Sequence, residues 1–466
     1  MWSARRGRSE RRAAMNGPVE VVVLSDASGQ LGSASVLDPQ TGNTLITYRG
    51  GGPVPARALG LLGGDHVLCA DEKRPLLHAW ALHSQEPVHR GVRLVTPGRV
   101  AALAASPDGT HVVAAVAEKL HVWQVASGCM VGVAEGHAGA VTAVRFLDDG
   151  SHFVSAGEDC AVAVWSLAQL ASVGRAAVHE PGRRTPPRHV FRDHSLPVSD
   201  LHVGAGGARA RVFTASADRT CKVYDLSSGT LLLTVVFDRC LTAVAADALE
   251  GEAFVGTAAG DIFQFSLRDP PRGREQLVHR DEAKMFVGHT GAVTCLSVSL
   301  DGATLLSGSS DRSVVLWDVP SRQAVRTLPC KGAVSNAFFH LAPRRLFSEP
   351  SGPRVTLHSL QRSTLANARE LVVDVVTTEE TGLEPEDPSA SLEDASSELE
   401  HVRTIAELKK INALLYKFAA EKLLQPFTDA VGQTDETAAD DPSSVQNKKR
   451  KKRIKKKKAK NKYKIL

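Results

Sequence analysis

An aromatic residue, most often Trp, recurs at the end of similar segments along this chain, and no other sequence feature limits the fold as strongly. Successive aromatics are 43, 42, 59, 41 and 52 residues apart. Residues 136–167 and 288–319 match position for position, with 28 residues from His to Trp in each. The two long steps contain insertions at 168–192 and 269–285, which we expect to form surface loops. The recurring aromatics are Trp80, Trp123, Trp165, Tyr224, Phe265 and Trp317.

The repeated segments alternate short β-branched runs with Asp-Gly and Ser-Asp turns, which predicts a meander of antiparallel strands. A period of about 40–45 residues is that of a WD repeat, whose four-stranded blades close into a ring with only short exposed edges. We therefore predict an all-β fold, a seven-bladed WD40 β-propeller spanning residues 19–360. Three strands from 19–48 and one from about 334–341 would form a mixed closing blade. An eight-bladed ring stays open, because residues 343–360 could form strands of their own.

The same residue types, His, then Ser or Thr, then Asp, recur before the aromatic in three of the repeats. A catalytic triad is needed only once, beside an oxyanion hole and a substrate pocket. Repetition at one spacing instead favours a structural network in which buried polar groups hydrogen-bond to one another. The residues assigned to this network are His137, Ser155, Asp159, Trp165, His194, Thr214, Asp218, Tyr224, His289, Ser307, Asp311 and Trp317.

Sequence motifs for metal, phosphate or cofactor binding do not occur in the chain. It contains no HExxH, no paired CxxC and no GxxxxGK[ST] motif, and its 17 His residues are dispersed. We therefore predict a protein that is not an enzyme and needs no cofactor or metal. Seven widely spaced cysteines and the lack of an apolar run of about 20 residues predict an intracellular protein that does not use a membrane.

Composition changes on both sides of the predicted propeller. Residues 1–18 are Arg-rich and are expected to form a disordered basic extension, with an alternative start at Met15. Residues 361–395 are expected to form an acidic disordered linker, since the stretch 377–400 carries nine carboxylates and no Lys or Arg. Residues 396–425 predict an amphipathic coiled-coil-type α-helix.

The predicted helix carries an apolar stripe flanked by charged residues. A helix of this length would extend about 45 Å, and its stripe is too apolar to be left in water. We expect the stripe to join two copies of the chain in a homodimer, with packing on the chain's own propeller as the alternative. The stripe residues are Leu399, Val402, Ile405, Leu408, Ile411, Leu415 and Phe418.

Residues 426–466 are expected to form a disordered tail that ends in a basic run. Positions 448–464 contain 13 Lys and Arg, so the rest of the chain has a net charge of 5 − 13 = −8. Such a run is typical of a nuclear-localisation signal and could also contact RNA phosphates without sequence specificity. The residues assigned to nuclear targeting are Lys448, Lys449, Arg450, Lys451, Lys452, Arg453, Lys455, Lys456, Lys457 and Lys458.

Several stretches of the chain resemble the WD repeat-containing protein 18 family, which supplies the propeller subunit of the rixosome. They are LITYRGG at 45–51, RHVFRDHSLPVSDLH at 188–202, ASADRTCKVYDLSSGTLLLTVVFD at 215–238, GHTGAVTCLSVS from Gly288 and ELKKINALLYKF at 407–418. The resemblance covers roughly residues 19–425. The basic tail after residue 447 and the Arg-rich start depart from the family pattern, so the resemblance says nothing of their purpose.

The resemblance implies a non-catalytic scaffold subunit of a nuclear rixosome-type complex that acts in large ribosomal subunit assembly and pre-rRNA processing. The implied partners are a proline-, glutamate- and leucine-rich scaffold, a helical-repeat subunit, a SUMO protease, the AAA ATPase midasin and pre-60S particles. It also implies that the C-terminal helix joins two copies, and that the protein lies in the nucleus, nucleolus and nucleoplasm. Because propellers support many functions, a nuclear WD40 substrate receptor or chromatin-binding adaptor is the alternative.

Overall fold

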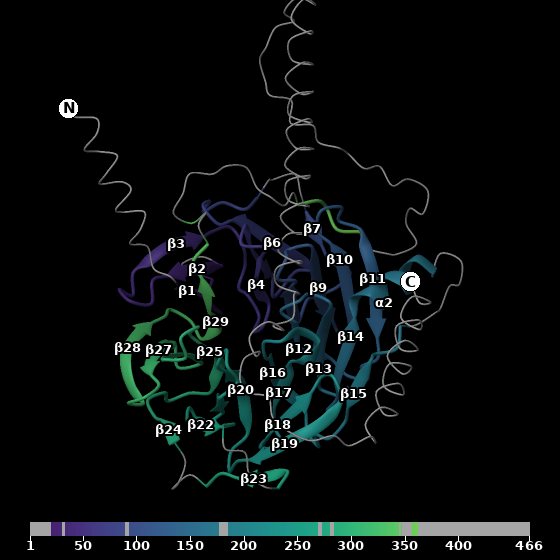
Figure 1. The fold of residues 1–466 in the computed structure, drawn as a ribbon. Helices are drawn as coiled ribbons and strands as arrows, with labels where there is room; N and C mark the ends of the chain where they lie inside the picture. Colours follow the sequence, from purple (N-terminus) through teal and green to yellow (C-terminus); the bar gives the residue numbers. More distant parts are fainter. Residues whose placement is uncertain are drawn as a thin grey trace, which may run out of the picture. The chain divides into compact units, whose positions relative to one another are not determined.

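Each repeat forms an antiparallel sheet, and seven such sheets stand around a ring as blades (Figure 1). The computed structural model describes residues 20–29, 33–88, 93–176, 185–268, 273–279, 284–343, 346 and 357–361. The seven-bladed all-β propeller predicted from the repeat is confirmed, and these residues form no eighth sheet.

Blade 1 closes the ring with strands from both ends of the propeller. β29 (Val334–Leu341) pairs antiparallel with β1 (Glu20–Asp26), so the last strand of the ring lies beside the first. Figure 1 shows this junction where the purple and green strands meet. The mixed closing blade predicted from 19–48 and 334–341 is confirmed. The sheet is completed by β2 (Ala34–Leu37) and β3 (Thr44–Tyr48).

Blades 2 to 4 follow in chain order, and the first strand of each is the innermost. Blade 2 contains β4 (Leu59–Leu62), β5 (His66–Ala70), β6 (Leu76–Ala81) and β7 (Leu94–Val95). Blade 3 contains β8 (Ala102–Ala105), β9 (His111–Val116), β10 (Lys119–Gln124) and β11 (Met130–Glu135). Blade 4 contains β12 (Val141–Phe146), β13 (His152–Gly157), β14 (Val162–Ser166) and β15 (His189–Phe191).

Blades 5 to 7 complete the ring, and blade 5 has a fifth strand. Blade 5 contains β16 (Val198–Val203), β17 (Arg211–Ser216), β18 (Thr220–Asp225), β19 (Thr230–Val236) and β23 (Glu275–Leu277), with a short 3-10 helix at Gly207–Arg209. Blade 6 contains β20 (Leu241–Ala246), β21 (Glu252–Thr257), β22 (Ile262–Ser266) and β24 (Lys284–Phe286). Blade 7 contains β25 (Val293–Val298), β26 (Thr304–Ser309), β27 (Ser313–Asp318) and β28 (Gln323–Pro329).

The two insertions that we predicted to be surface loops contain regular structure, so that prediction is wrong in part. Helix α2 (Leu167–Ala176) packs on β11 of blade 3, and its Leu170 is fully buried. Gly132 of β11 makes room for the helix, because a Cβ there would lie 3.2 Å from the Leu170 carbonyl oxygen. In the second insertion, β23 pairs in parallel with β19. Both elements cover outer strands whose edges would otherwise be exposed.

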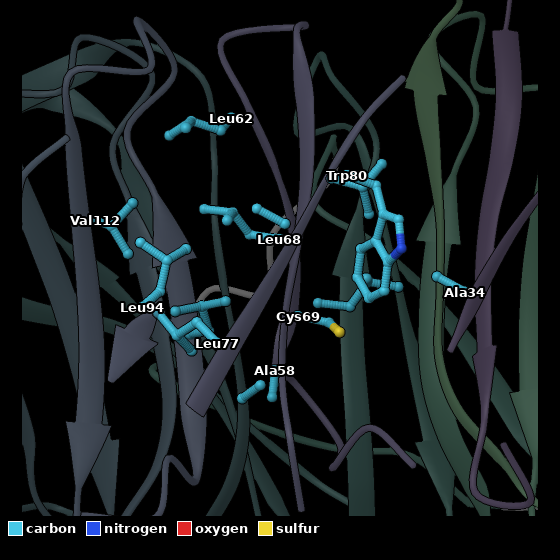
Figure 2. Packing of buried hydrophobic residues seen from close by; sticks show 14 of the residues in the cluster. Ala34, Ala58, Leu62, Leu68, Cys69, Leu77, Trp80, Leu94 and Val112 are labelled. Atoms are coloured by element: carbon cyan, nitrogen blue, oxygen red, sulfur yellow. The ribbon is translucent and has the colours of Figure 1, made fainter. Parts of the chain in front are cut away.

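Apolar side chains from neighbouring blades form the core of the ring. β13 is buried on nearly every residue because it lies in the middle of its sheet, with a blade on either side. Figure 2 shows Trp80 lying toward Ala34 of blade 1 and Leu94 lying toward Val112 of blade 3. Each blade therefore buries its faces against its two neighbours, which makes stability a property of the closed ring. The indoles that are at most 2% exposed belong to Trp80, Trp123, Trp165 and Trp317.

Candidate functional site

In blade 7 the predicted polar residues form a continuous chain of hydrogen bonds. The Trp317 indole nitrogen lies 2.8 Å from Ser307 Oγ, which lies 2.7 Å from His289 Nε2. His289 Nδ1 lies 2.9 Å from Asp311 Oδ2. An indole N–H only donates and an ionised carboxylate only accepts, so Ser307 donates to His289 and His289 donates to Asp311. One arrangement of protons therefore satisfies all four groups.

Blade 4 repeats this chain with nearly the same geometry. The Trp165 indole nitrogen is 2.8 Å from Ser155 Oγ, and Ser155 Oγ is 2.7 Å from His137 Nε2. His137 Nδ1 lies 3.0 Å from Asp159 Oδ1. Two separate sets of side chains in different blades thus hold the same arrangement.

Blade 5 brings the predicted residues together but closes the chain differently. His194 Nε2 lies 2.7 Å from Thr214 Oγ1, and His194 Nδ1 lies 2.9 Å from Asp218 Oδ2. Thr214 Oγ1 also lies 3.3 Å from the Lys222 carbonyl oxygen. Tyr224 fills the position of the indole and stacks on Phe191 at 4.2 Å, but its hydroxyl makes no hydrogen bond with Thr214. Tyr224 therefore belongs to the packing of this blade and does not extend its hydrogen-bond chain.

The carboxylates of these networks are held in the ionised form. Burial acts to raise the pKa of Asp311, but hydrogen bonds from Ser313, His289 and a backbone amide outweigh it and hold the pKa at about 2. The same balance between burial and hydrogen bonding lowers the pKa of Asp159 and of Asp218. Each Asp also accepts a hydrogen bond from the backbone amide after its His, which ties the turn to the strand.

The hydroxyls of the networks have no exposed surface. A nucleophile has to contact its substrate, yet Ser155, Thr214 and Ser307 are all 0% exposed. Each hydroxyl oxygen is also in contact with a His ring that is already bonded to Asp. This geometry supports the interpretation that the networks hold a loop onto a blade.

Blade 2 lacks the hydroxyl of the complete networks. Ala70 stands ten residues before Trp80, where blades 4 and 7 have Ser. The Trp80 indole instead donates to the Arg49 carbonyl oxygen at 2.8 Å. No residue pattern in the sequence indicates this contact, because any residue type can offer a backbone carbonyl.

Blade 3 has Val113 at the same position, and its Trp123 indole donates to the carbonyl oxygen of Gln361 at 2.8 Å. The Gln361 side-chain oxygen accepts a hydrogen bond from the Met130 backbone amide at 3.1 Å. The Gln361 backbone amide donates to the Gly128 carbonyl oxygen at 2.9 Å. Residues 357–361 thus return to blade 3 after the ring has closed, and we name them the blade 3 clasp. The apolar residues of the clasp that pack on the core are Leu357 and Leu360.

Arg57 links blade 2 to the opposite side of the ring. Its Nε lies 2.8 Å from Asp200 Oδ1 in β16, and its Nη2 lies 2.8 Å from the Thr242 carbonyl oxygen in β20. Asp200 also accepts from the Val244 amide at 3.1 Å. Arg57 has a φ of 60°, a conformation that costs a residue with a side chain about 1–2 kcal/mol. The ion pair joins positions far apart in sequence, so no local motif indicates it.

The remaining predicted sites lie elsewhere in the chain. The stripe in 396–425 and the nuclear-targeting residues in 448–458 are outside the described residues. Within the part that the structure describes, no group of three or more His, Cys, Asp or Glu is arranged to hold a metal. The same part contains no helix that is both long enough and apolar enough to cross a membrane.

Comparison with known proteins gives one family model and several relatives. The model of the WD domain, G-beta repeat, matches residues 128–166, 185–225 and 281–318. WD repeat-containing protein 18 of Rattus norvegicus is 42% identical over 75% of this chain and 80% of its own length. The protein of the same name from Danio rerio is 37% identical over 88% of this chain and its full length. Pre-rRNA-processing protein IPI3 of Yarrowia lipolytica is 33% identical over 66% of this chain and 72% of its own length.

Proposed function

The chain belongs to the WD repeat-containing protein 18 family, and we propose that it is a non-catalytic scaffold subunit acting in large ribosomal subunit assembly and pre-rRNA processing. The observation that carries this proposal is its relation to a protein named for pre-rRNA processing, which extends over 72% of that relative. The same relation extends over 66% of this chain, so the proposal concerns the part that the two proteins share.

The described architecture suits a subunit that binds other proteins. The polar residues that resemble a catalytic triad are buried and occur in three blades, so they support a structural role better than a reaction. A ring of seven blades offers many surface loops on a rigid scaffold. We therefore infer membership of a protein complex and no turnover of its own.

The finer features of this proposal come from the family resemblance and the chain's composition. We propose that the complex is of the rixosome type, with the scaffold, helical-repeat, SUMO-protease and midasin partners named above. Homodimerisation through 396–425 and non-specific RNA contact by the tail belong to the same proposal. The nucleus, the nucleolus and the nucleoplasm are its expected locations.

The proposed function is tested by depleting the protein and measuring rRNA precursors. We expect precursors that retain the internal spacer preceding the large-subunit rRNA to accumulate, and re-expression of the chain to restore processing. Unchanged precursor levels after efficient depletion would contradict the proposal. Affinity purification distinguishes the proposed function from the alternative. A substrate receptor would recover a cullin adaptor and a chromatin adaptor would recover histones, in place of ribosome-assembly factors.

We expect deletion of residues 447–466 to weaken nuclear and nucleolar accumulation, because this segment contains the basic run. Deletion of residues 427–446 is the matched control, since it removes a segment of equal length without the run. Imaging of tagged chains in cells depleted of the endogenous protein measures the effect. Full nuclear accumulation without 447–466 would show that the tail is not the targeting signal.

A further inference from the structure

Two adjoining cavities form a groove at the end of the ring where the innermost strands end. One cavity, of about 460 Å³, lies at the mouth of the central channel among the ends of β12, β16, β20, β25 and β29. The other, of about 760 Å³, lies between blades 7 and 1. We name the two together the mouth groove. Residues that line both cavities are Glu20, Ser299, Leu300 and Phe339.

The lining of the mouth groove includes exposed apolar side chains. Leu300 is 60% exposed, Val325 is 67% exposed and Leu341 is 51% exposed, and all three line one or both cavities. Large apolar side chains gathered beside a hollow, with polar residues around them, are typical of an interaction site. The groove therefore has both the shape and the apolar surface to hold an extended peptide segment.

The groove carries more negative than positive charge. Five carboxylates line it, and in the described residues none has a Lys or Arg within ion-pair distance. Arg326 also lines it and donates to the carbonyl oxygens of Gln40 and Thr41, so one positive charge stands against five negative ones. Burial, helped by the charge of Arg145, lowers the pKa of His202 to about 4 and keeps that ring neutral. The five carboxylates are those of Glu20, Asp148, Asp247, Asp301 and Asp318.

Those carboxylates accept hydrogen bonds mainly from backbone amides, which leave their charge uncompensated. Glu20 Oε1 lies 2.6 Å from the Leu300 amide, and Asp318 Oδ2 lies 3.0 Å from the Ser321 amide. Hydrogen bonds from Ser299 and Ala303 lower the pKa of Asp301. A segment that carries several Arg or Lys would fit such a groove by charge.

The chain carries such a segment directly before the groove. Residues 1–19 enter the ring at Glu20, which lines both cavities. Five Arg lie between positions 5 and 12, and at about 3.3 Å per residue they lie within about 50 Å of Glu20 along the chain. The basic run at 448–464 is a weaker candidate, since more than eighty residues separate it from Gln361 and a longer tether lowers the effective concentration. The five Arg are Arg5, Arg6, Arg8, Arg11 and Arg12.

We propose that the Arg-rich segment 5–12 docks in the mouth groove of its own propeller and pairs with its carboxylates. A short tether gives the segment an effective concentration in the millimolar range, so it excludes other basic segments of moderate affinity. A chain that starts at Met15 lacks all five Arg and presents an open groove. The N-terminal extension thus controls access to an acidic docking site for basic peptides.

A labelled peptide of residues 1–15 tests this proposal by fluorescence anisotropy. We expect it to bind the chain lacking residues 1–14, and to bind the full chain at least tenfold more weakly, because the full chain supplies its own competitor. Affinity for the shortened chain should fall as salt rises, since the contacts are ionic. Equal affinity for the full and shortened chains overturns the proposal.

The site is located by variants of the shortened chain. We expect the triple substitution Glu20→Gln, Asp301→Asn and Asp318→Asn to weaken peptide binding at least tenfold. The matched control Glu118→Gln, Glu158→Gln and Asp238→Asn removes the same charge from turns at the opposite end of the blades and should have little effect. Equal weakening by both triples would show attraction to overall charge and overturn the proposal.

Competition by a peptide of residues 447–466 shows which of the two basic ends of the chain occupies the groove. Weaker competition by this peptide than by unlabelled 1–15 supports the N-terminal assignment, whereas stronger competition assigns the groove to the tail and overturns it. The comparison of full and shortened chains uses no substituted blade, so the proposal stays testable if a triple variant fails to fold.

Discussion

In blades 2, 3, 4 and 7, the presence or absence of one hydroxyl decides how the buried Trp is held. Where Ser155 or Ser307 is present, the indole N–H ends a chain that runs through His to Asp. Where Ala70 or Val113 takes that position, the indole donates to a backbone carbonyl from another segment. A buried N–H without a partner costs about 1–3 kcal/mol, so the loss of the hydroxyl forces another segment of the chain to supply an acceptor.

At this scale we expect His289→Ala and Asp311→Ala each to lower the free energy of unfolding by about 1–3 kcal/mol, because each leaves a buried partner unpaired. His83→Ala, at an exposed position, is the control and should change stability little. Urea unfolding followed by circular dichroism measures the difference. Wild-type stability in both variants, or loss of an enzymatic turnover by a fully folded variant, would contradict the structural role.

At the scale of elements, segments outside the repeats complete the blades. Helix α2 covers β11, strand β23 extends blade 5, and the blade 3 clasp supplies the acceptor for Trp123. The clasp follows the strand that closes the ring, so blade 3 depends on a segment that a propeller defined by its repeats alone would omit. Its Leu357 and Leu360 also cover apolar core residues of blades 2 and 3.

We therefore expect a chain ending at Leu346 to be less stable than a chain ending at Gln361. The shorter chain leaves the Trp123 indole without its acceptor, which costs about 1–3 kcal/mol, and it uncovers the apolar surface under the clasp. Urea unfolding of the two truncated chains gives the difference, and red-shifted Trp fluorescence of the shorter one would report exposure of Trp123. Identical stability would show that the clasp contributes nothing to the blade.

At the scale of the whole molecule, contacts across the ring join its distant parts. Pairing of β1 with β29 fastens the first strand to the last, and Arg57 joins blade 2 to Asp200 of blade 5. Within the described residues, these contacts close the ring. The apolar stripe of the predicted helix at 396–425 then needs a partner, and a second copy of the chain offers an identical stripe.

We expect replacement of Leu408, Ile411 and Leu415 by Asp to abolish self-association, because each charge would lie in the predicted helix interface and a buried unpaired charge costs several kcal/mol. Multi-angle light scattering should give the variant half the mass of the wild type, and the unfolding transition of the propeller should be the same in both. A wild type that is monomeric at micromolar concentration would contradict the homodimer.

The matched control for this variant carries the same three charges on the other side of the predicted helix. At 3.6 residues per turn, Ala406, Ala413 and Ala420 lie opposite Leu408, Ile411 and Leu415, and their replacement by Asp should leave the dimer intact. Loss of the dimer in both triples would indicate a loss of helicity in place of a specific interface.

The repeat by itself determined the fold class and predicted the closing blade, whereas the choice between seven and eight blades was settled by the structure. Those features depend on local spacing: about 40–45 residues per blade, alternation along strands and turn residues between them. The sequence also predicted the pairs His289–Ser307 and His137–Ser155. A repeated spacing places equivalent side chains together in every blade that keeps them.

Only the tertiary structure decided the contacts that join distant parts of the chain. The bond from Trp123 to Gln361 spans 238 positions, and the Arg57–Asp200 pair spans 143. Neither pair has a spacing that repeats. Every residue type has a backbone carbonyl, so the sequence does not indicate where such an acceptor lies. The mouth groove likewise exists only once the ends of five innermost strands meet around a channel. The periodicity of the sequence indicates the features that each blade shares with the next. These contacts instead depend on how the closed ring brings together segments that do not repeat.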